Sequence, residues 1–122
     1  MAKKILIAED EKPLAKALQL KLNHEGFEAE IASDGEEALE HIKTGKYELV
    51  LLDLMMPKID GFGVLESLQK AKSTVPVIVT TNLSQPEDLA RVRSLGARGY
   101  LVKSNTPLSG IIQRIKELLD QT

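Results

Sequence analysis

Five short apolar runs, each followed by a longer stretch of helical periodicity, constrain this chain more than any other feature. They are residues 4–8, 28–32, 49–52, 77–80 and 100–102. Runs such as ILIA, LVLL and VIV lack the polar alternation of a half-exposed strand, which predicts strands covered on both faces, as in a parallel sheet. The chain is therefore predicted to adopt an α/β fold in which a five-stranded (βα)5 sheet is doubly wound with helices.

Signals for helix starts follow the predicted strands. Four are present: Pro13 after Asp10, Ser33 three residues before Glu36, Ser84 three residues before Glu87, and Thr106 before Pro107. In the last segment the apolar residues share one stripe at helical spacing, which predicts a helix that packs on the sheet. No linker or low-complexity tract interrupts the pattern, so residues 1–122 are predicted to form a single domain.

Composition narrows the possible functions. The chain carries a net charge of -2, which gives no overall attraction to nucleic acid or to an anionic membrane, so direct nucleic-acid binding is not expected. It has no cysteines, which rules out disulfides and thiolate metal sites. No apolar run approaches the roughly 18 residues of a membrane span, and the N-terminus does not resemble a secretory signal. A cytoplasmic protein that does not enter the membrane is expected.

Polar side chains stand where the predicted strands end. Glu9 and Asp10 follow the first strand, Asp53 the third, Thr81 the fourth and Lys103 the fifth. Ligands of doubly wound sheets bind beyond the carboxyl ends of the strands. If the first and third strands are neighbours, their carboxylates crowd together, which is costly unless a cation offsets the repulsion. Oxygen ligands alone favour Mg2+. Lys103 and Thr81 could then contact a phosphoryl group, with Asp53 as the nucleophile.

These residues also form a recognisable set. Glu9-Asp10, Asp53 with Met56-Pro57 and Asp60-Gly61, Thr81, and Gly99-Tyr100-Leu101-Val102-Lys103 occur in this order along nearly the whole chain. The set resembles the response-regulator receiver family of two-component signalling, the chemotaxis-regulator type. The resemblance implies a flavodoxin-like sheet with strand order 2-1-3-4-5.

Roles for individual residues are carried over from that resemblance. Asp53 would be the phosphorylation site, and Mg2+ would be bound by Asp10, Asp53 and the Met55 backbone carbonyl, with Glu9 acting through water. Lys103 would pair with the phosphoryl group. Thr81 would turn inward to bond it, and Tyr100 would exchange between outward and inward rotamers.

The same resemblance implies partners. The phosphoryl donor would be a sensor histidine kinase or a phosphotransfer protein. The domain would not be an enzyme in its own right, although it would supply residues for its own phosphorylation and slow autodephosphorylation. Its downstream effector or output domain would bind the face formed by the fourth helix, the fifth strand and the fifth helix, and a phosphorylation-dependent homodimer is possible.

Two residues depart from the family pattern. Ser104 occupies a position where the family often has a proline after a cis bond. A cis bond to a non-proline residue costs about 3 to 4 kcal/mol, so the bond should be trans or conspicuously strained. Asn82 stands where a small residue is common, which could narrow access to the site. Met55 and Leu83 would flank it, and we hypothesise that these apolar side chains slow the attack of water.

Other interpretations remain open. A single acidic residue after a strand is more often a turn former than a nucleophile. A functional role for Asp53 is favoured only because Asp10, Thr81 and Lys103 occur at the ends of the other strands. An aspartyl phosphatase would need a carboxylate at Met55. A flavodoxin-like electron carrier would need a Gly-, Ser- or Thr-rich phosphate loop after the first strand. The remaining alternative is a degenerate, unphosphorylated receiver that acts as a docking or dimerisation module.

Overall fold

The computed structural model describes residues 2–83 and 85–120. Within them, five strands alternate with five helices, in agreement with the predicted (βα)5 pattern. The strands are β1 (Lys4–Ala8), β2 (Glu28–Ala32), β3 (Leu49–Asp53), β4 (Val77–Thr81) and β5 (Gly99–Val102). The helices are α1 (Lys12–His24), α2 (Gly35–Ile42), α3 (Gly61–Lys70), α4 (Pro86–Ser94) and α5 (Leu108–Asp120), and a short 3-10 turn, η1 (Lys103–Asn105), follows β5.

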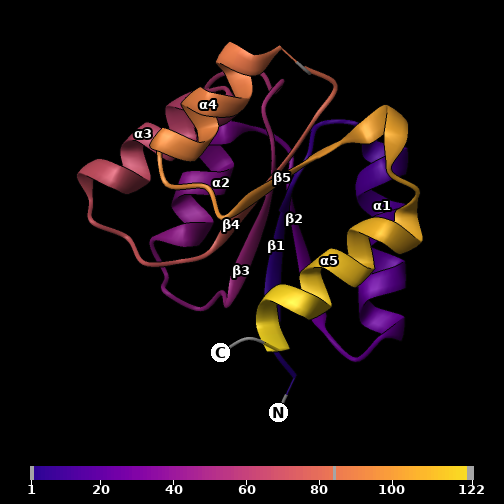
Figure 1. Ribbon diagram of the computed structural model, residues 1–122. Coiled ribbons are helices and arrows are strands. Elements are labelled where there is room, and N and C mark those ends of the chain that lie inside the picture. Colours follow the sequence, from indigo (N-terminus) through magenta and orange to yellow (C-terminus); the bar gives the residue numbers. More distant parts are fainter. Residues whose placement is uncertain (1, 84, 121–122) are drawn as a thin grey trace.

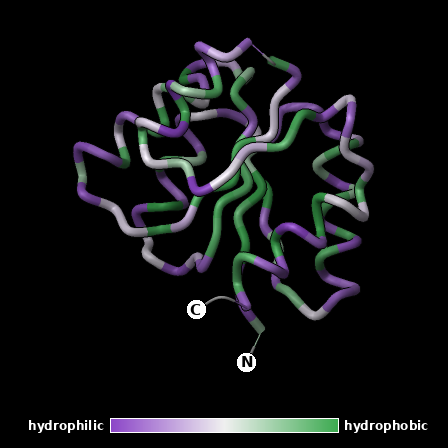
Figure 2. The backbone as a smooth tube through the Cα atoms, in the orientation of Figure 1, coloured by the Kyte–Doolittle hydropathy of each residue, from purple (hydrophilic) through white to green (hydrophobic). Residues whose placement is uncertain are grey.

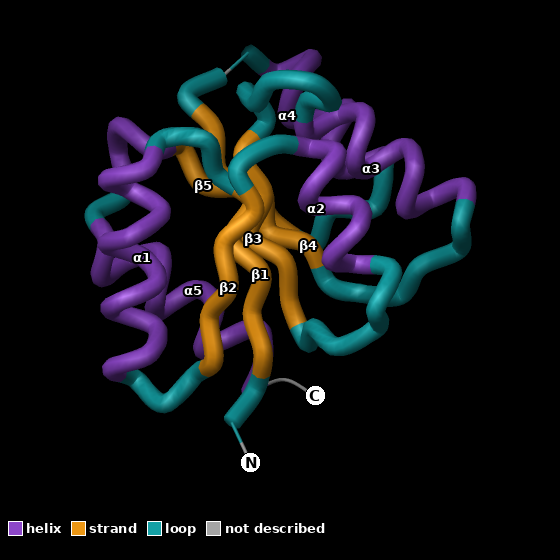
Figure 3. Tube along the Cα trace, turned by 180° about the vertical axis from the view of Figure 1, so that it is seen from behind, coloured by secondary structure: helices purple, strands orange, loops and turns teal. Residues whose placement is uncertain are grey.

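The strands form one parallel sheet in the order β2-β1-β3-β4-β5. This confirms the α/β fold class, the doubly wound arrangement and the strand order that the family resemblance implied. Figures 1 and 3 show the sheet at the centre, with α1 and α5 on one face and α2, α3 and α4 on the other. The winding direction reverses between β1 and β3, which is where ligands bind in sheets of this kind.

The sheet divides the apolar core into two layers. Ile5 and Ile7 of β1 pack with α1 and α5 on one side, whereas Leu6 and Ala8 pack with α2, α3 and α4 on the other. Successive side chains of a strand point to opposite faces, so a strand buried on both sides must be apolar throughout. Figure 2 shows the resulting hydrophobic centre within a more hydrophilic periphery. The predicted stripe of α5 is confirmed, because its buried residues are Ile111, Ile112, Ile115, Leu118 and Leu119.

The helix starts agree in part with the predicted signals. Pro13 lies in the first turn of α1, as predicted. The prediction for Ser33 is wrong: Asp34 is the N-cap of α2, and its carboxylate accepts the Glu37 backbone N–H at 2.7 Å. Asp34 is followed three residues later by Glu37, just as Ser33 is followed by Glu36. Both residues therefore fit the capping-box pattern, in which a glutamate lies three residues after the N-cap. Ser84 lies outside the described residues.

Two glycines allow close packing around the loop after β3. A Cβ atom on Gly35 would lie 1.8 Å from the Ile59 carbonyl oxygen, and one on Gly61 would lie 2.6 Å from Leu54 Cα. Asp60 caps α3 by accepting the Gly63 backbone N–H at 2.8 Å. The loop is therefore held between α2 and the start of α3. No helix in the described part of the chain is long and apolar enough to cross a membrane.

Candidate functional site

The carboxyl ends of four strands bring the predicted site residues together. Glu9 and Asp10 come directly after β1, Asp53 is the last residue of β3, and Thr81 is the last residue of β4. Lys103 follows β5 as the first residue of η1. The register places Asp53 opposite Thr80, so the ends of β3 and β4 lie at the same level of the sheet.

Three carboxylates form the acidic part of the site. Glu9, Asp10 and Asp53 each offer an oxygen, and these oxygens all lie within 4.8 Å of one another. Glu9 and Asp53 are buried, at 3% and 2% exposure, whereas Asp10 is exposed. Two of the three carboxyl groups are therefore enclosed by the protein and the third lies at the solvent boundary. The charged forms of such neighbours repel one another unless a cation lies between them.

Lys103 supplies a cation from the protein itself. Its ammonium nitrogen lies 2.7 Å from Glu9 Oε1 and 3.1 Å from Asp53 Oδ2, and its side chain is only 11% exposed. A carboxylate oxygen of Glu11 lies farther away, at 3.8 Å. Lys103, which was predicted to pair with a phosphoryl group, thus lies beside Asp53. Its ion pair with Glu9 was not predicted from the sequence.

Burial and neighbouring charges shift the pKa values of both Glu9 and Lys103. Burial raises the pKa of the Glu9 carboxyl to about 7. Hydrogen bonds from Lys103 and from the Glu11 backbone N–H oppose the rise, and the charge of Asp53 adds to it. Burial disfavours the charged form of Lys103, but its hydrogen bond to Glu9 and the charges of Asp53 and Glu9 outweigh burial and raise the pKa of the ammonium group.

The donor set fits a hard divalent cation. Glu9, Asp10 and Asp53 present carboxylate oxygens only, and magnesium prefers oxygen ligands while keeping several waters. The Met55 backbone N–H donates to Asp53 Oδ1 at 3.2 Å, which fixes the turn directly after the strand. The side chain of Met55 is exposed at 62%, so it does not fill the core, in contrast to the buried Met56.

Thr81 and Tyr100 occupy two neighbouring strands. Thr81 is fully buried, and its hydroxyl oxygen accepts the Leu83 backbone N–H at 2.9 Å. Tyr100 is half-buried and packs against the apolar layer that contains α3 and α4. The Arg93 guanidinium of α4 lies 5.9 Å from the centre of the Tyr100 ring. Thr81 borders the acidic site, while Tyr100 connects β5 to α4.

The two departures from the family pattern lie beside the site. The described part of the chain has no cis peptide bond, so the bond between Lys103 and Ser104 is trans, one of the two outcomes expected. The Ser104 backbone N–H donates to Asn82 Oδ1 at 3.1 Å. Sequence reasoning singled out both residues without pairing them. Each of them follows the end of one of two neighbouring strands, but their pairing depends on the register of β4 against β5.

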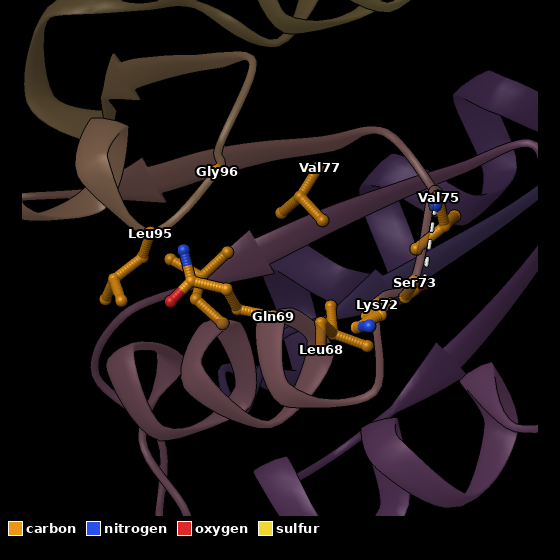
Figure 4. Close-up of a pocket in the computed structure, with 9 residues that line it drawn as sticks. Leu68, Gln69, Lys72, Ser73, Val75, Val77, Leu95 and Gly96 are labelled. Carbon is orange, nitrogen blue, oxygen red and sulfur yellow. Dashed lines mark hydrogen bonds between the residues drawn. The ribbon is translucent and has the colours of Figure 1, made fainter.

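A separate cavity of about 280 Å3 lies at the other end of β4. Figure 4 shows its lining, which includes Leu68, Gln69 and Lys72 of the α3 region and Leu95 after α4. Val77, the first residue of β4, also lines it, whereas Thr81 at the acidic site is the last residue of that strand. The cavity is thus no part of the site formed by the carboxylates and Lys103.

The model of the response regulator receiver domain matches residues 5–116. The chain belongs to the response regulator receiver family. Receiver domains of this family are signalling proteins that pair with histidine kinases and downstream effectors. The match runs from the second residue of β1 into α5, and it includes every residue of the acidic site.

Curated relatives agree with this assignment. The transcriptional regulatory protein DltR of Streptococcus agalactiae is 42% identical over 100 residues, which cover 82% of this chain and 45% of DltR. The alkaline phosphatase synthesis transcriptional regulatory protein PhoP of Bacillus subtilis is 37% identical over 119 residues, covering 98% of this chain and 49% of PhoP. The receiver chain thus spans about half the length of these relatives.

Solved structures of receiver domains have the same fold. The Francisella response regulator 1452 receiver domain superposes with a TM-score of 0.91 at 32% identity, and 98% of each chain is covered. A CheY-like response regulator receiver domain from Methanospirillum hungatei JF-1 has a TM-score of 0.91 at 29% identity, covering 99% of this chain and 96% of the other. Both cover all the elements that position the carboxylates and Lys103.

Proposed function

We propose that this receiver is a phosphorylation-dependent switch in which Asp53 accepts a phosphoryl group from a sensor histidine kinase or a phosphotransfer protein. The observation that carries the proposal is the position of Asp53, buried at the end of β3 beside the Lys103 ammonium and close to the carboxylates of Glu9 and Asp10. A buried nucleophile needs neighbouring cations both to stay ionised and to receive an anion.

The proposed reaction uses residues already in place. A carboxylate oxygen of Asp53 forms a bond to phosphorus while the bond from phosphorus to the donor histidine nitrogen breaks, and that nitrogen leaves with its electron pair. Lys103 neutralises one phosphoryl oxygen. The Thr81 hydroxyl oxygen accepts the Leu83 N–H, so its own proton is available to donate to another phosphoryl oxygen.

Mg2+ would be bound by Asp10, Asp53 and the Met55 backbone carbonyl, with Glu9 acting through a water molecule. When bound, it would supply positive charge to the phosphoryl oxygens. The proximity of the carboxylate oxygens of Glu9, Asp10 and Asp53 supports this ligand set. Among the described ion pairs, Lys103 is the one cation that pairs with both buried carboxylates.

The proposed output is a change of surface. The phosphoryl group favours the conformation in which Thr81 and Tyr100 are drawn inward. The domain population shifts towards this conformation, and the face formed by α4, β5 and α5 changes with it. A downstream effector, an output domain or a second copy of the chain would bind this face in the cytoplasm. The position of Tyr100 on β5, beside Arg93 of α4, supports it as the connection between the site and that face.

The test is intact-mass measurement after incubation with Mg2+ and a small phosphodonor. Wild type should gain one phosphoryl group, and Asp53→Ala should gain none. Asp60→Ala is the matched control, because Asp60 caps α3 outside the acidic cluster and its loss should leave the adduct unchanged. If wild type gained no phosphoryl group, the proposal would fail, and the alternative of an unphosphorylated docking or dimerisation module would take its place.

A further inference from the structure

A hydrogen bond joins the loops that follow β4 and β5. The Asn82 side-chain oxygen accepts the Ser104 backbone N–H at 3.1 Å. The register of the two strands explains the pairing, since Thr81 lies opposite Val102 at their ends. Asn82 directly follows Thr81, and Ser104 directly follows Lys103. The bond therefore connects the residues adjacent to two side chains that the proposed function assigns to the phosphoryl group.

The donor is an N–H that would otherwise lack a partner within its own turn. Ser104 is the second residue of η1, and the first N–H groups of a helical turn have no acceptor inside that turn. A proline at this position would have no N–H to donate. Asn82 has an amide oxygen that a small apolar residue would lack. The two departures from the family pattern are thus a matched donor and acceptor.

We propose that Asn82 is a positioning residue that holds the backbone at Lys103 and so keeps the ammonium group directed at Asp53. The inference rests on the proposed role of Asp53. Lys103 has a long, flexible side chain whose tip is fixed by Glu9 and Asp53. Its backbone is held on one side by β5, and on the other by the bonded Ser104 N–H and by a 3.4 Å hydrogen bond from the Thr106 N–H to the Lys103 carbonyl. Loss of the Asn82 bond removes the shorter of these two hydrogen bonds and loosens the backbone that carries the ammonium group.

The same bond links the movements of the two loops. Thr81 is tied to its own loop through the Leu83 N–H, so an inward movement of Thr81 displaces Asn82 as well. Asn82 in turn carries that displacement to Ser104, the neighbour of Lys103, whose ammonium group already lies 3.1 Å from Asp53.

The bond itself can be tested without phosphorylation. Asn82 is exposed, so replacing it should leave the core intact. Asn82→Leu keeps the bulk of the side chain and removes the acceptor, whereas Asn82→Asp keeps an acceptor oxygen. Hydrogen exchange of the Ser104 amide should become about two- to tenfold faster in Asn82→Leu and stay slow in Asn82→Asp, as expected for the loss of one hydrogen bond. Equal exchange in all three proteins would overturn the proposal.

The positioning role is tested by the rate of phosphorylation with a small phosphodonor and Mg2+. Asn82→Leu should lower the rate about two- to tenfold. Ser104→Ala, which keeps the backbone N–H, should react as wild type does. In a Lys103→Ala background, Asn82→Leu should have no further effect, because a residue that acts through Lys103 has nothing left to position.

The outcomes separate this inference from the proposed function. An Asn82→Leu effect that persists without Lys103 would mean that the side chain controls access instead, and it would overturn the inference. So would a wild-type rate in Asn82→Leu. A wild-type chain that takes no phosphoryl group at all would overturn the proposed function together with the inference, while exchange at Ser104 would still report whether the bond exists.

Discussion

The ammonium nitrogen of Lys103 lies 3.1 Å from a carboxylate oxygen of Asp53, although 49 residues separate the two in the sequence. The contact exists because β3 and β5 flank β4 in a parallel sheet, so their carboxyl ends meet at one edge. It joins the proposed phosphoryl acceptor to a cation that is itself nearly buried. Most of the behaviour expected of the site follows from this ion pair and its extension to Glu9.

Lys103→Met should destabilise the protein in metal-free buffer. The substitution leaves Glu9 and Asp53 buried without their cation, and breaking a buried pair in this way costs about 3 kcal/mol. Urea unfolding measures the loss. Mg2+ should restore part of the stability, since it would supply the missing positive charge. The control is Lys16→Met, because within the described residues the exposed Lys16 forms a hydrogen bond to Gln19 and no ion pair. A similar loss there would contradict the explanation.

Stability should depend on pH through Glu9. Its pKa rises from 4.5 to about 7 on folding, so the folded chain holds the proton more tightly than the unfolded chain. The Glu9 contribution is therefore greatest at acidic pH, falls as the pH rises from 4.5 through 7, and levels off above 7. The total fall is on the order of 3 kcal/mol. Unfolding measured across this range in metal-free buffer should show a flatter dependence for Glu9→Gln, and parallel curves would argue against Glu9 as the titrating group.

Asp10→Asn should weaken Mg2+ binding by about tenfold or more. Asp10 is the exposed member of the carboxylate cluster, so its loss removes a ligand without leaving a buried cavity. Titration followed by amide chemical shifts around Asp53 would give the affinity. Glu11→Gln serves as the control, because Glu11 is also acidic and exposed but lies outside the cluster. If both variants lost affinity equally, general surface charge would be responsible.

The fold and the main site residues were predictable for a physical reason. In a parallel sheet every strand presents its carboxyl end to the same edge, so Glu9, Asp53, Thr81 and Lys103 were expected at one edge once the strands were recognised. The strand order that makes them neighbours came from the family resemblance, and the structure confirms it. Helix caps were harder, because Ser33 and Asp34 satisfy the same local rule and only tertiary packing chooses between them. The bond between Asn82 and Ser104 required the register of β4 against β5, which sequence periodicity does not provide.

Leu83→Ala should speed the loss of phosphate from the phosphorylated protein by several-fold, on the hypothesis that Leu83 shields the site from water. Leu83 is half-buried and packs against the apolar layer next to Thr81. Decay of the phosphorylated mass over time measures the rate. Leu20→Ala is the control, since Leu20 is an exposed leucine of α1 at 58% exposure. An unchanged rate in Leu83→Ala would remove the hypothesis.

Gly35→Ala should destabilise the fold by about 1–3 kcal/mol. The new Cβ would lie 1.8 Å from the Ile59 carbonyl oxygen, so either α2 or the loop after β3 must move. Thermal unfolding would show the loss. Gly110→Ala provides the comparison, because its Cβ would meet only side-chain atoms, the nearest being Thr106 Cγ2 at 3.1 Å. A larger loss for Gly110→Ala than for Gly35→Ala would contradict the predicted clash.

The order of the strands also determines when the site can come into existence. Glu9 follows β1 and its partner Lys103 follows β5, so Glu9 is synthesised well before Lys103. Until β5 has been synthesised and has docked beside β4, the carboxylates have no lysine to pair with. A truncated or half-folded chain therefore cannot present the complete pair of Glu9 and Asp53 with Lys103. The sheet topology therefore makes the site depend on the whole sheet, because Glu9, Asp53 and Lys103 come together only after the chain has folded as far as β5.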